Sequence, residues 1–241
     1  MLSKTRGIVL NYFKYSENSI IVKIYTEDFG LQSFIIRSAR NKKSHIKKGI
    51  FQPLTLLDLV INQNKRSGLH SIQEITNYNQ LNELSLDIRK SSLAIFIAEI
   101  LNKSIHEEEQ NKLLFDFLYS EIQLLDKKEG RISDFHLYFL LDLTKFLGFY
   151  PQNNFVESCG IFNLYNGKFQ EPIPEHKYFI EPELSKYLHK IITISNSARD
   201  QLLIPSDIRK ELINKLLDYY RIHLNGFSIV RSHTVLEEIF A

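Results

Sequence analysis

The chain has 241 residues, 44% hydrophobic and 24% charged, with a formal net charge of +2, a composition that excludes a disordered or low-complexity protein. Its single cysteine, Cys159, excludes an internal disulfide bond and a four-cysteine zinc site. Charged residues come too early in the N-terminal segment for a signal peptide, and the longest clean apolar run, residues 93–98, is too short to span a membrane. We therefore expect a cytoplasmic protein without membrane association.

The first 80 residues contain five β-rich segments. Their apolar residues alternate, as Ile20, Val22 and Ile24 do, and turn-forming residues separate them, with Gly30 free to adopt positive φ. The predicted strands are residues 7–15, 19–26, 31–37, 54–62 and 69–78. Five short strands with no room for a long helix predict a small barrel. The oligonucleotide/oligosaccharide-binding (OB) barrel is the first choice, and an SH3-like barrel is the alternative.

A strongly basic segment lies between the third and fourth predicted strands. Residues 37–48, RSARNKKSHIKK, contain six Lys and Arg and no acidic residue. Residues 1–70 hold 12 Lys and Arg against 4 Asp and Glu, a net charge of +8, whereas the remaining residues hold 18 against 24, a net charge of −6. This asymmetry suggests two regions with different partners, with chance clustering on a solvated surface as the alternative.

Helical periodicity replaces the strand pattern after about residue 80. The predicted helices are residues 86–101, 112–125, 133–147, 206–224 and 232–240, with Ser133 and Ser206 as N-caps and Gly148 at a C-terminal end. Residues 150–180 are rich in Pro, Gly and Asn and predict an irregular insertion with a hairpin around 161–169. The fold class is therefore α+β, with an OB domain at 1–79 and a helical domain at 80–241.

A search for catalytic motifs finds neither a glycine-rich phosphate loop nor a nucleophile elbow, and no histidine pair has metal-ligand spacing with a third ligand close by. We therefore predict that the protein is not an enzyme. The basic segment is the best candidate site, because Lys and Arg neutralise phosphates. The residues predicted to contact phosphates are Arg37, Arg40, Lys42, Lys43, Lys47 and Lys48.

Aromatic side chains on an OB barrel can add base stacking to this charge. The first 51 residues contain several candidates: Tyr12, Phe13, Tyr15, Tyr25, Phe29, Phe34 and Phe51. We expect most of them to be structural and one or two to stack on a base.

Several short segments along nearly the whole chain form a pattern through their order and spacing. They are GIVL at 7–10, TEDFG at 26–30, RSAR at 37–40, QPL at 52–54, LGFYP at 147–151, HL at 223–224, RS at 231–232 and VL at 235–236. In this order and spacing they resemble the RecO family of bacterial DNA repair proteins.

The resemblance implies an N-terminal OB domain, a helical domain and a zinc-ribbon insertion. It also implies binding to single- and double-stranded DNA, annealing of complementary strands, and work alongside RecR and the acidic C-terminal tail of single-stranded DNA-binding protein so that RecA can load. Many family members carry four ribbon cysteines, but this chain retains only Cys159, so we expect no zinc and an insertion held by packing. For the pocket that binds the tail, Arg131, Arg199 and Arg209 are candidates.

The leading hypothesis is a non-enzymatic recombination mediator that binds DNA near the bacterial nucleoid. One rival is a protein-docking adaptor whose helical domain binds an acidic peptide. The other is an RNA-binding OB module.

Overall fold

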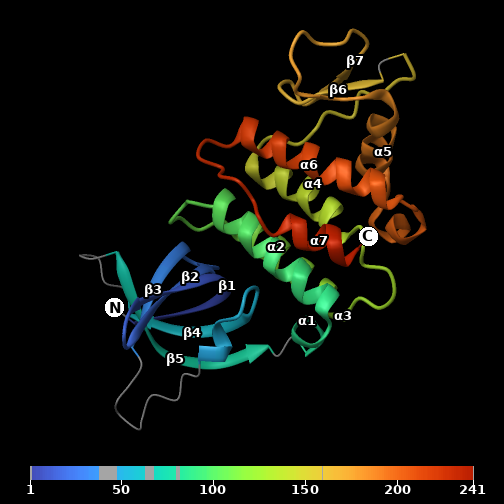
Figure 1. Ribbon diagram of the computed structural model, residues 1–241. Coiled ribbons are helices and arrows are strands. Elements are labelled where there is room, and N and C mark those ends of the chain that lie inside the picture. Colours follow the sequence, from blue (N-terminus) through green and yellow to red (C-terminus); the bar gives the residue numbers. More distant parts are fainter. Residues whose placement is uncertain (1, 38–47, 63–67, 80–81, 159, 241) are drawn as a thin grey trace. The chain divides into compact units, whose positions relative to one another are not determined.

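The computed structural model describes residues 2–37, 48–62, 68–79, 82–158 and 160–240. The chain divides into two compact units, Met1–Lys127 and Lys128–Ala241 (Figure 1). Among the helices in these described ranges, none is long and apolar enough to cross a membrane.

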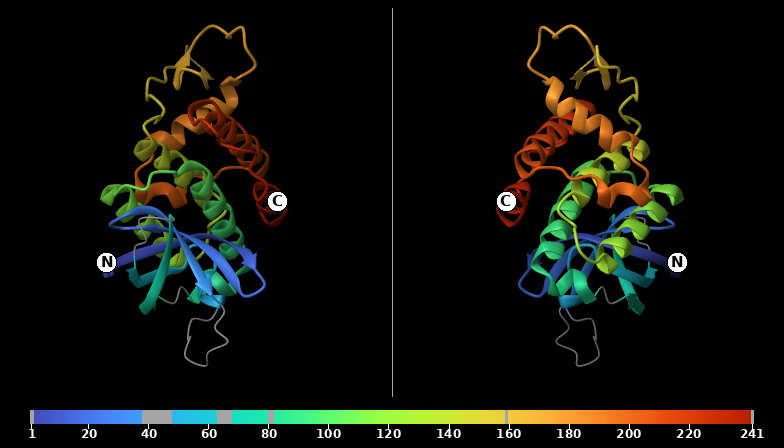
Figure 2. Two further views of the ribbon diagram at one scale, coloured as in Figure 1. Left: turned by 90° about the vertical axis from the view of Figure 1, so that its left-hand side faces the viewer. Right: turned by 90° about the vertical axis from the view of Figure 1, so that its right-hand side faces the viewer.

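The first unit contains a closed five-stranded barrel with the strand order β1-β2-β3-β5-β4. Its strands are β1 (Leu2–Ser16), β2 (Ser19–Thr26), β3 (Gly30–Arg37), β4 (Leu56–Asn62) and β5 (Leu69–Asn79). Neighbouring strands are antiparallel except for a short parallel pairing of β3 with β5. This order is OB-like and confirms the predicted fold class over the SH3-like alternative. Figure 2 shows the barrel strands from two opposite sides.

The barrel closes because β1 pairs with β4 on one side and with β2 on the other. Gly7 pairs with Leu57 of β4 and also with Thr26 of β2. A Cβ atom at Gly7 would lie 2.6 Å from Ile24 Cγ2 and 3.1 Å from Leu59 Cδ1, so a larger residue would push the strands apart. The closed barrel buries an apolar cluster of Val9, Ile20, Val22, Ile24, Phe34, Ile36, Phe51, Leu57, Leu59, Ile61 and Ile72.

The fourth strand begins two residues later than predicted. Leu54 is fully buried in a left-handed conformation with φ of 63°, and its backbone N–H donates to the Val9 carbonyl oxygen at 2.7 Å. This turn follows the 3₁₀ helix η1 (Lys48–Phe51) and delays the start of β4 until Leu56. The prediction of a strand from residue 54 is therefore wrong at its first two positions.

Three helices complete the first unit: α1 (Asn82–Leu86), α2 (Ile88–Ser104) and α3 (Lys112–Lys127). The single helix predicted for 86–101 is interrupted at Asp87, whose side chain accepts a hydrogen bond from the Arg89 backbone N–H and caps α2. The connection between α2 and α3 contacts the barrel, where the Leu31 N–H donates to the Glu107 carbonyl oxygen at 3.0 Å. Gly30, with φ of 62°, has no room for a Cβ, because the Glu107 oxygen would lie 2.6 Å away.

An ion-pair network joins β1, the β2–β3 turn and α3. The Arg6 guanidinium donates to both carboxylate oxygens of Glu27, at 2.8 and 2.9 Å, and lies over the rings of Phe115 and Tyr119. Lys112 Nζ donates to Glu27 at 3.0 Å. These hydrogen bonds, chiefly those from Arg6, lower the pKa of the Glu27 carboxyl to about 2. The barrel and α3 therefore share both polar and aromatic contacts, and the predicted boundary between 79 and 80 stays a prediction.

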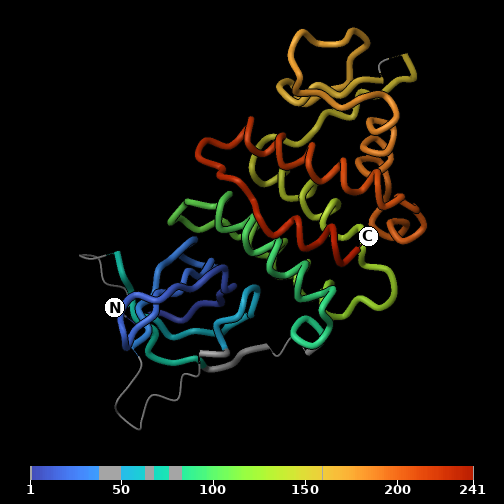
Figure 3. The backbone as a smooth tube through the Cα atoms, viewed as in Figure 1, coloured from blue at the N-terminus to red at the C-terminus, as the bar shows by residue number. Residues whose placement is uncertain are grey.

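The second unit consists of helices with a small sheet inserted after the first of them, and Figure 3 traces its backbone in yellow to red. Its elements are α4 (Phe135–Leu147), β6 (Ile161–Asn163), β7 (Lys168–Gln170), β8 (Phe179–Ile180), α5 (Pro182–Thr193), η2 (Asn196–Gln201), α6 (Ser206–His223) and α7 (His233–Ile239). The predicted hairpin at 161–169 and the helix at 232–240 are confirmed. Gly148 ends α4 with φ of 85°, as expected.

Both predicted serine N-caps in this unit are wrong. Asp134, not Ser133, stands at the N-cap of α4 and makes no side-chain capping bond, because its carboxylate binds Arg131 and Arg209 instead. Ser206 is the first residue of α6 and Pro205 is its N-cap. Long-range ion pairing thus overrides a local capping preference at α4.

We predict that Glu27→Gln destabilises the protein at neutral pH by about 1–3 kcal/mol, because it breaks charge-assisted hydrogen bonds in a part-buried network. The lowered pKa of Glu27 means that its contribution is complete above its ordinary value of 4.5 and is lost as the pH falls toward about 2. Urea unfolding at neutral pH and at about pH 3 should show the difference between variant and wild type shrinking in acid.

The matched control is Glu17→Gln, which removes the same charge from the exposed β1–β2 turn, where Glu17 has no ion pair within the described residues. A difference between Glu27→Gln and wild type that stays constant with pH would contradict the assigned role of this network.

Candidate nucleic-acid interface

The structure places the two ends of the basic segment but not its middle. Arg37 is the exposed last residue of β3, and Lys48 begins η1. Four of the predicted DNA-binding residues, Arg40, Lys42, Lys43 and Lys47, lie outside the described residues. Because Arg37 pairs with Ser19, the first residue of β2, the basic segment leaves the barrel beside the β1–β2 turn. The assignment of all six residues to DNA stays a prediction.

The seven candidate aromatic residues separate clearly by exposure. Tyr25, Phe34 and Phe51 are buried, and Phe29 is partly buried against the barrel core. The other three lie on β1 and are exposed: Tyr12 by 48%, Phe13 by 45% and Tyr15 by 58%. Only these three, among the seven, present rings that a base could reach.

The register of β1 explains this exposure. The ladder between β1 and β4 ends at the pair Ile8–Leu56, whereas the ladder with β2 continues to the pair Ser16–Ser19. From Asn11 onward β1 therefore has β2 on one side only, and every residue of 11–16 is exposed. The second half of β1 and the start of β2 form a hairpin that extends past the closed part of the barrel.

The hairpin offers aromatic and basic groups on both faces. Residues paired across strands share a face, so Tyr12 and Lys14 lie on the side of their core-facing partners Val22 and Ile20. Phe13 lies on the outer face. We call these groups, with their basic neighbours on β2 and β3, the hairpin surface: Tyr12, Phe13, Lys14, Tyr15, Lys23 and Arg37.

This combination suits a single-stranded nucleic acid chemically. Exposed rings stack on bases with little regard to sequence, and amines and guanidinium groups neutralise the phosphates between them. Lys23 and Arg37 share the outer face with Phe13, because Lys23 pairs with Ser33 and Arg37 with Ser19 in the same ladder. The acidic residue nearest in sequence to the three exposed rings is Glu17, in the β1–β2 turn.

The three arginines considered for a peptide pocket are each paired with a carboxylate in the second unit. Arg131 and Arg209 both bind Asp134, the latter at 2.9 Å, and Arg199 binds Asp142 at 2.6 Å. Both aspartates are largely buried. The charge of these arginines is therefore committed to internal pairs, and Arg209 also lines a pocket.

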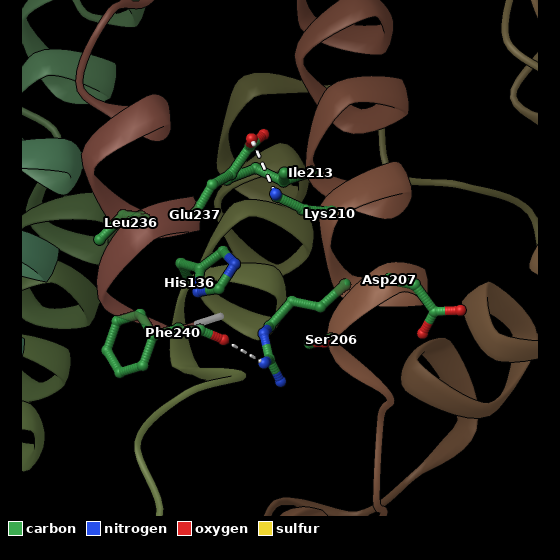
Figure 4. A pocket seen from close by; sticks show the side chains of 9 residues that line it. His136, Ser206, Asp207, Lys210, Ile213, Leu236, Glu237 and Phe240 are labelled. Carbon is green, nitrogen blue, oxygen red and sulfur yellow. Dashed lines mark hydrogen bonds and ion pairs between the residues drawn. The ribbon is translucent and has the colours of Figure 1, made fainter.

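That pocket has a volume of about 270 Å³ and lies among α4, α6 and α7 (Figure 4). Its lining is His136, Ser206, Asp207, Arg209, Lys210, Ile213, Leu236, Glu237 and Phe240. Burial, with a smaller effect from the Arg209 charge, lowers the pKa of His136 to about 3, so this side chain is neutral at physiological pH. Sequence reasoning missed the pocket, because its residues come from three separated segments with no shared motif.

The insertion is held by an amide and by aromatic packing. The Asn154 side chain donates to the Phe169 carbonyl oxygen and accepts from the Phe169 N–H, both at 2.9 Å. Buried Ser185 accepts from the Phe162 N–H and donates to the Ile180 carbonyl oxygen. The rings of Phe162 and Phe169 are buried edge-on against each other, with Phe155, His189 and Tyr219 around them.

The donors present do not fit the four-cysteine zinc site of a ribbon. The sequence contains one cysteine, and Cys159 lies outside the described residues. Elsewhere in the described part, no three His, Cys, Asp or Glu side chains cluster closely enough to hold a metal ion. Buried rings form the centre of the insertion.

The chain is thus an OB-like barrel protein with a helical second part and an inserted three-stranded sheet. Residues 1–80 match the family model for the recombination protein O N terminal, and residues 85–231 match that for the recombination protein O C terminal. The chain belongs to the RecO family of DNA repair proteins.

Curated relatives named DNA repair protein RecO align with the chain over its full length and over theirs. The protein of Flavobacterium psychrophilum is 36% identical over 242 residues, that of Phocaeicola vulgatus 34% over 242, and that of Azobacteroides pseudotrichonymphae 34% over 240.

We propose that the insertion folds without a metal ion and predict that a chelator leaves the melting temperature unchanged. Asn154→Ala should loosen the β6–β7 hairpin, because it leaves two backbone groups of Phe169 unpaired, at a cost of about 1–3 kcal/mol. Hydrogen exchange of residues 161–170 should rise in this variant and not in Asn153→Ala, the neighbouring exposed amide.

Zinc bound in equal amount to the purified chain, together with a lower melting temperature after chelation, would overturn the metal-free assignment. Equal exchange in the two asparagine variants would show that the Asn154 amide does not hold the hairpin.

Proposed function

We propose that this chain is a DNA-binding recombination mediator, which binds single- and double-stranded DNA, anneals complementary strands, and promotes RecA loading with RecR and single-stranded DNA-binding protein. The observation that carries the DNA-binding part is the hairpin surface, where exposed rings lie beside the exposed Lys14 and Arg37 and the half-buried Lys23. The basic segment leaves β3 at Arg37, next to the turn of the same hairpin.

The mechanism requires binding and charge neutralisation rather than bond chemistry. Phosphates of one strand lie along the basic residues while bases stack on one or more of the three exposed rings. Neutralising the first strand lowers its repulsion of the complementary strand, so annealing proceeds without nucleotide hydrolysis. In this proposal the protein is not an enzyme and acts in the bacterial cytoplasm at the nucleoid.

A second candidate function, docking of an acidic peptide, is supported by the pocket in the second unit. Ile213 of α6 gives the pocket an apolar wall, and the half-exposed Lys210 amine stands at its rim. We propose this pocket as the place where the acidic tail of single-stranded DNA-binding protein docks. Apolar groups would give the affinity and the amine would select an acidic partner.

We predict that replacing the exposed rings weakens single-stranded DNA binding. Tyr12→Ala and Phe13→Ala, made separately because the residues lie on opposite faces of the hairpin, should identify the face that holds bases. The productive one should lose about 1–3 kcal/mol, or about five- to hundredfold in affinity. Fluorescence anisotropy with a labelled oligonucleotide measures the change.

The control is Tyr165→Ala, which removes a ring of similar exposure, 47%, from the second unit. Wild-type affinity in Tyr12→Ala, Phe13→Ala and Tyr15→Ala alike would exclude base stacking on the hairpin surface.

We also predict that DNA affinity falls steeply with salt and collapses in the double variant Lys42→Glu/Lys43→Glu. Each phosphate contact on a single strand contributes a log–log slope of about −0.7. The charge-matched control is Lys168→Glu/Lys186→Glu, two exposed lysines of the second unit without ion pairs in the described ranges.

A flat salt dependence would refute the DNA-binding proposal. Unchanged DNA affinity in Lys42→Glu/Lys43→Glu, with weaker capture of an acidic peptide, would support the adaptor function in its place. Competition between matched DNA and RNA strands tests the RNA-binding alternative.

A further inference from the structure

The last described segment of the chain has the chemistry of an acidic peptide ligand. Residues 236–240 read Leu-Glu-Glu-Ile-Phe, which places two carboxylates between apolar side chains. Three of these residues, Leu236, Glu237 and Phe240, line the pocket among α4, α6 and α7 (Figure 4). The chain therefore presents its own acidic and apolar segment to the pocket proposed for peptide docking.

Polar contacts hold this segment at both of its ends. Arg209 Nη2 donates to the Phe240 carbonyl oxygen at 2.7 Å, while Nη1 of the same guanidinium binds Asp134 at 2.9 Å. Lys210 Nζ lies 3.7 Å from Glu237, whose carboxylate also accepts from the Asn214 amide at 3.4 Å. Arg209 is thus fixed from the α4 side with one donor directed at the end of α7.

These contacts hold α7 only weakly. The helix has seven residues, Ser232 provides no side-chain cap, and Leu236 is its one buried residue. A helix this short is unstable on its own and depends on its docking contacts. The pair between Lys210 and Glu237 is half-exposed on the lysine side, so water screens it and it adds little stability. An external peptide with more acidic residues can therefore compete with the segment.

We infer that α7 is a built-in competitor, a lid whose Leu236, Glu237 and Phe240 form one wall of the pocket until an acidic peptide with apolar end groups takes its place against α4 and α6. This inference rests on the proposed peptide-docking function and adds its regulation. Because peptide binding requires the open state, the apparent dissociation constant is the intrinsic one divided by the open fraction. A variant that weakens the lid but leaves the pocket intact then binds peptide more tightly.

The experiment uses the full chain and the labelled peptide Asp-Asp-Leu-Glu-Glu-Ile-Phe, with its Asn and Gln counterpart as the uncharged control. Glu237→Gln removes the partner of Lys210 and should tighten peptide binding about two- to fivefold, the range expected for loss of a weak ion pair. Glu238→Gln is the matched control, because Glu238 is exposed on the same helix and pairs with no described residue.

Hydrogen exchange provides a second measurement that a simple change of surface charge would not alter. Saturating wild type with peptide should raise exchange in residues 233–239 as α7 is displaced. Tighter binding of the charged peptide than of its uncharged counterpart by wild type tests the docking function independently of the lid.

The outcomes separate the lid from the docking function. Preferential binding of the charged peptide, with equal affinities of Glu237→Gln and Glu238→Gln and no exchange change in α7, would overturn the lid and leave the docking function standing. No peptide binding by wild type or by Glu237→Gln would overturn both. Tighter binding in Glu237→Gln alone, with faster exchange in α7, would establish the lid.

Discussion

The pairing of β1 with two partners is the constraint on which the first unit depends. Gly7 belongs to both ladders, and the absence of a side chain lets β2 and β4 approach β1 from either side. The closed barrel uses only the first half of β1 for both ladders, so the second half extends beyond β4. The hairpin surface is thus a consequence of barrel closure, because the residues that no strand covers are those left open to a ligand.

The second unit depends instead on buried ion pairs. Asp134 accepts hydrogen bonds from Arg131 and Arg209. Arg209 lies 75 residues further along the chain than Asp134. Burying these charges is unfavourable unless each is paired and hydrogen-bonded, and the remaining Arg209 donors meet this need at the Ile204 and Phe240 carbonyl oxygens. The same guanidinium therefore satisfies the interior and anchors the edge of the pocket.

Local patterns predicted the five barrel strands and most of the helices, but missed α1, α5 and the long-range pairings. Alternation located the five strands, and the positive φ of Gly30 and Gly148 followed from turn chemistry. Ser133 failed as a cap because ion pairs distant in sequence decide the conformation at Asp134. For the site, the sequence supplied seven aromatic candidates but not their exposure, since exposure depends on where the β4 ladder ends. The pocket could not be predicted from the sequence, because residues of three separated segments line it.

The insertion and α7 are anchored to their unit in the same way, but they bury different amounts of apolar surface. Each is a short element that cannot fold alone, and each is tied to its unit by a polar anchor on a backbone carbonyl, Asn154 in one case and Arg209 in the other. The insertion adds buried rings at Phe162 and Phe169, whereas α7 adds only Leu236. Because burial of apolar area is the larger contribution, it supports our two proposals, that the insertion stays fixed without a metal and that α7 is open to competition. In these proposals the amount of buried apolar surface separates a fixed insertion from a displaceable lid.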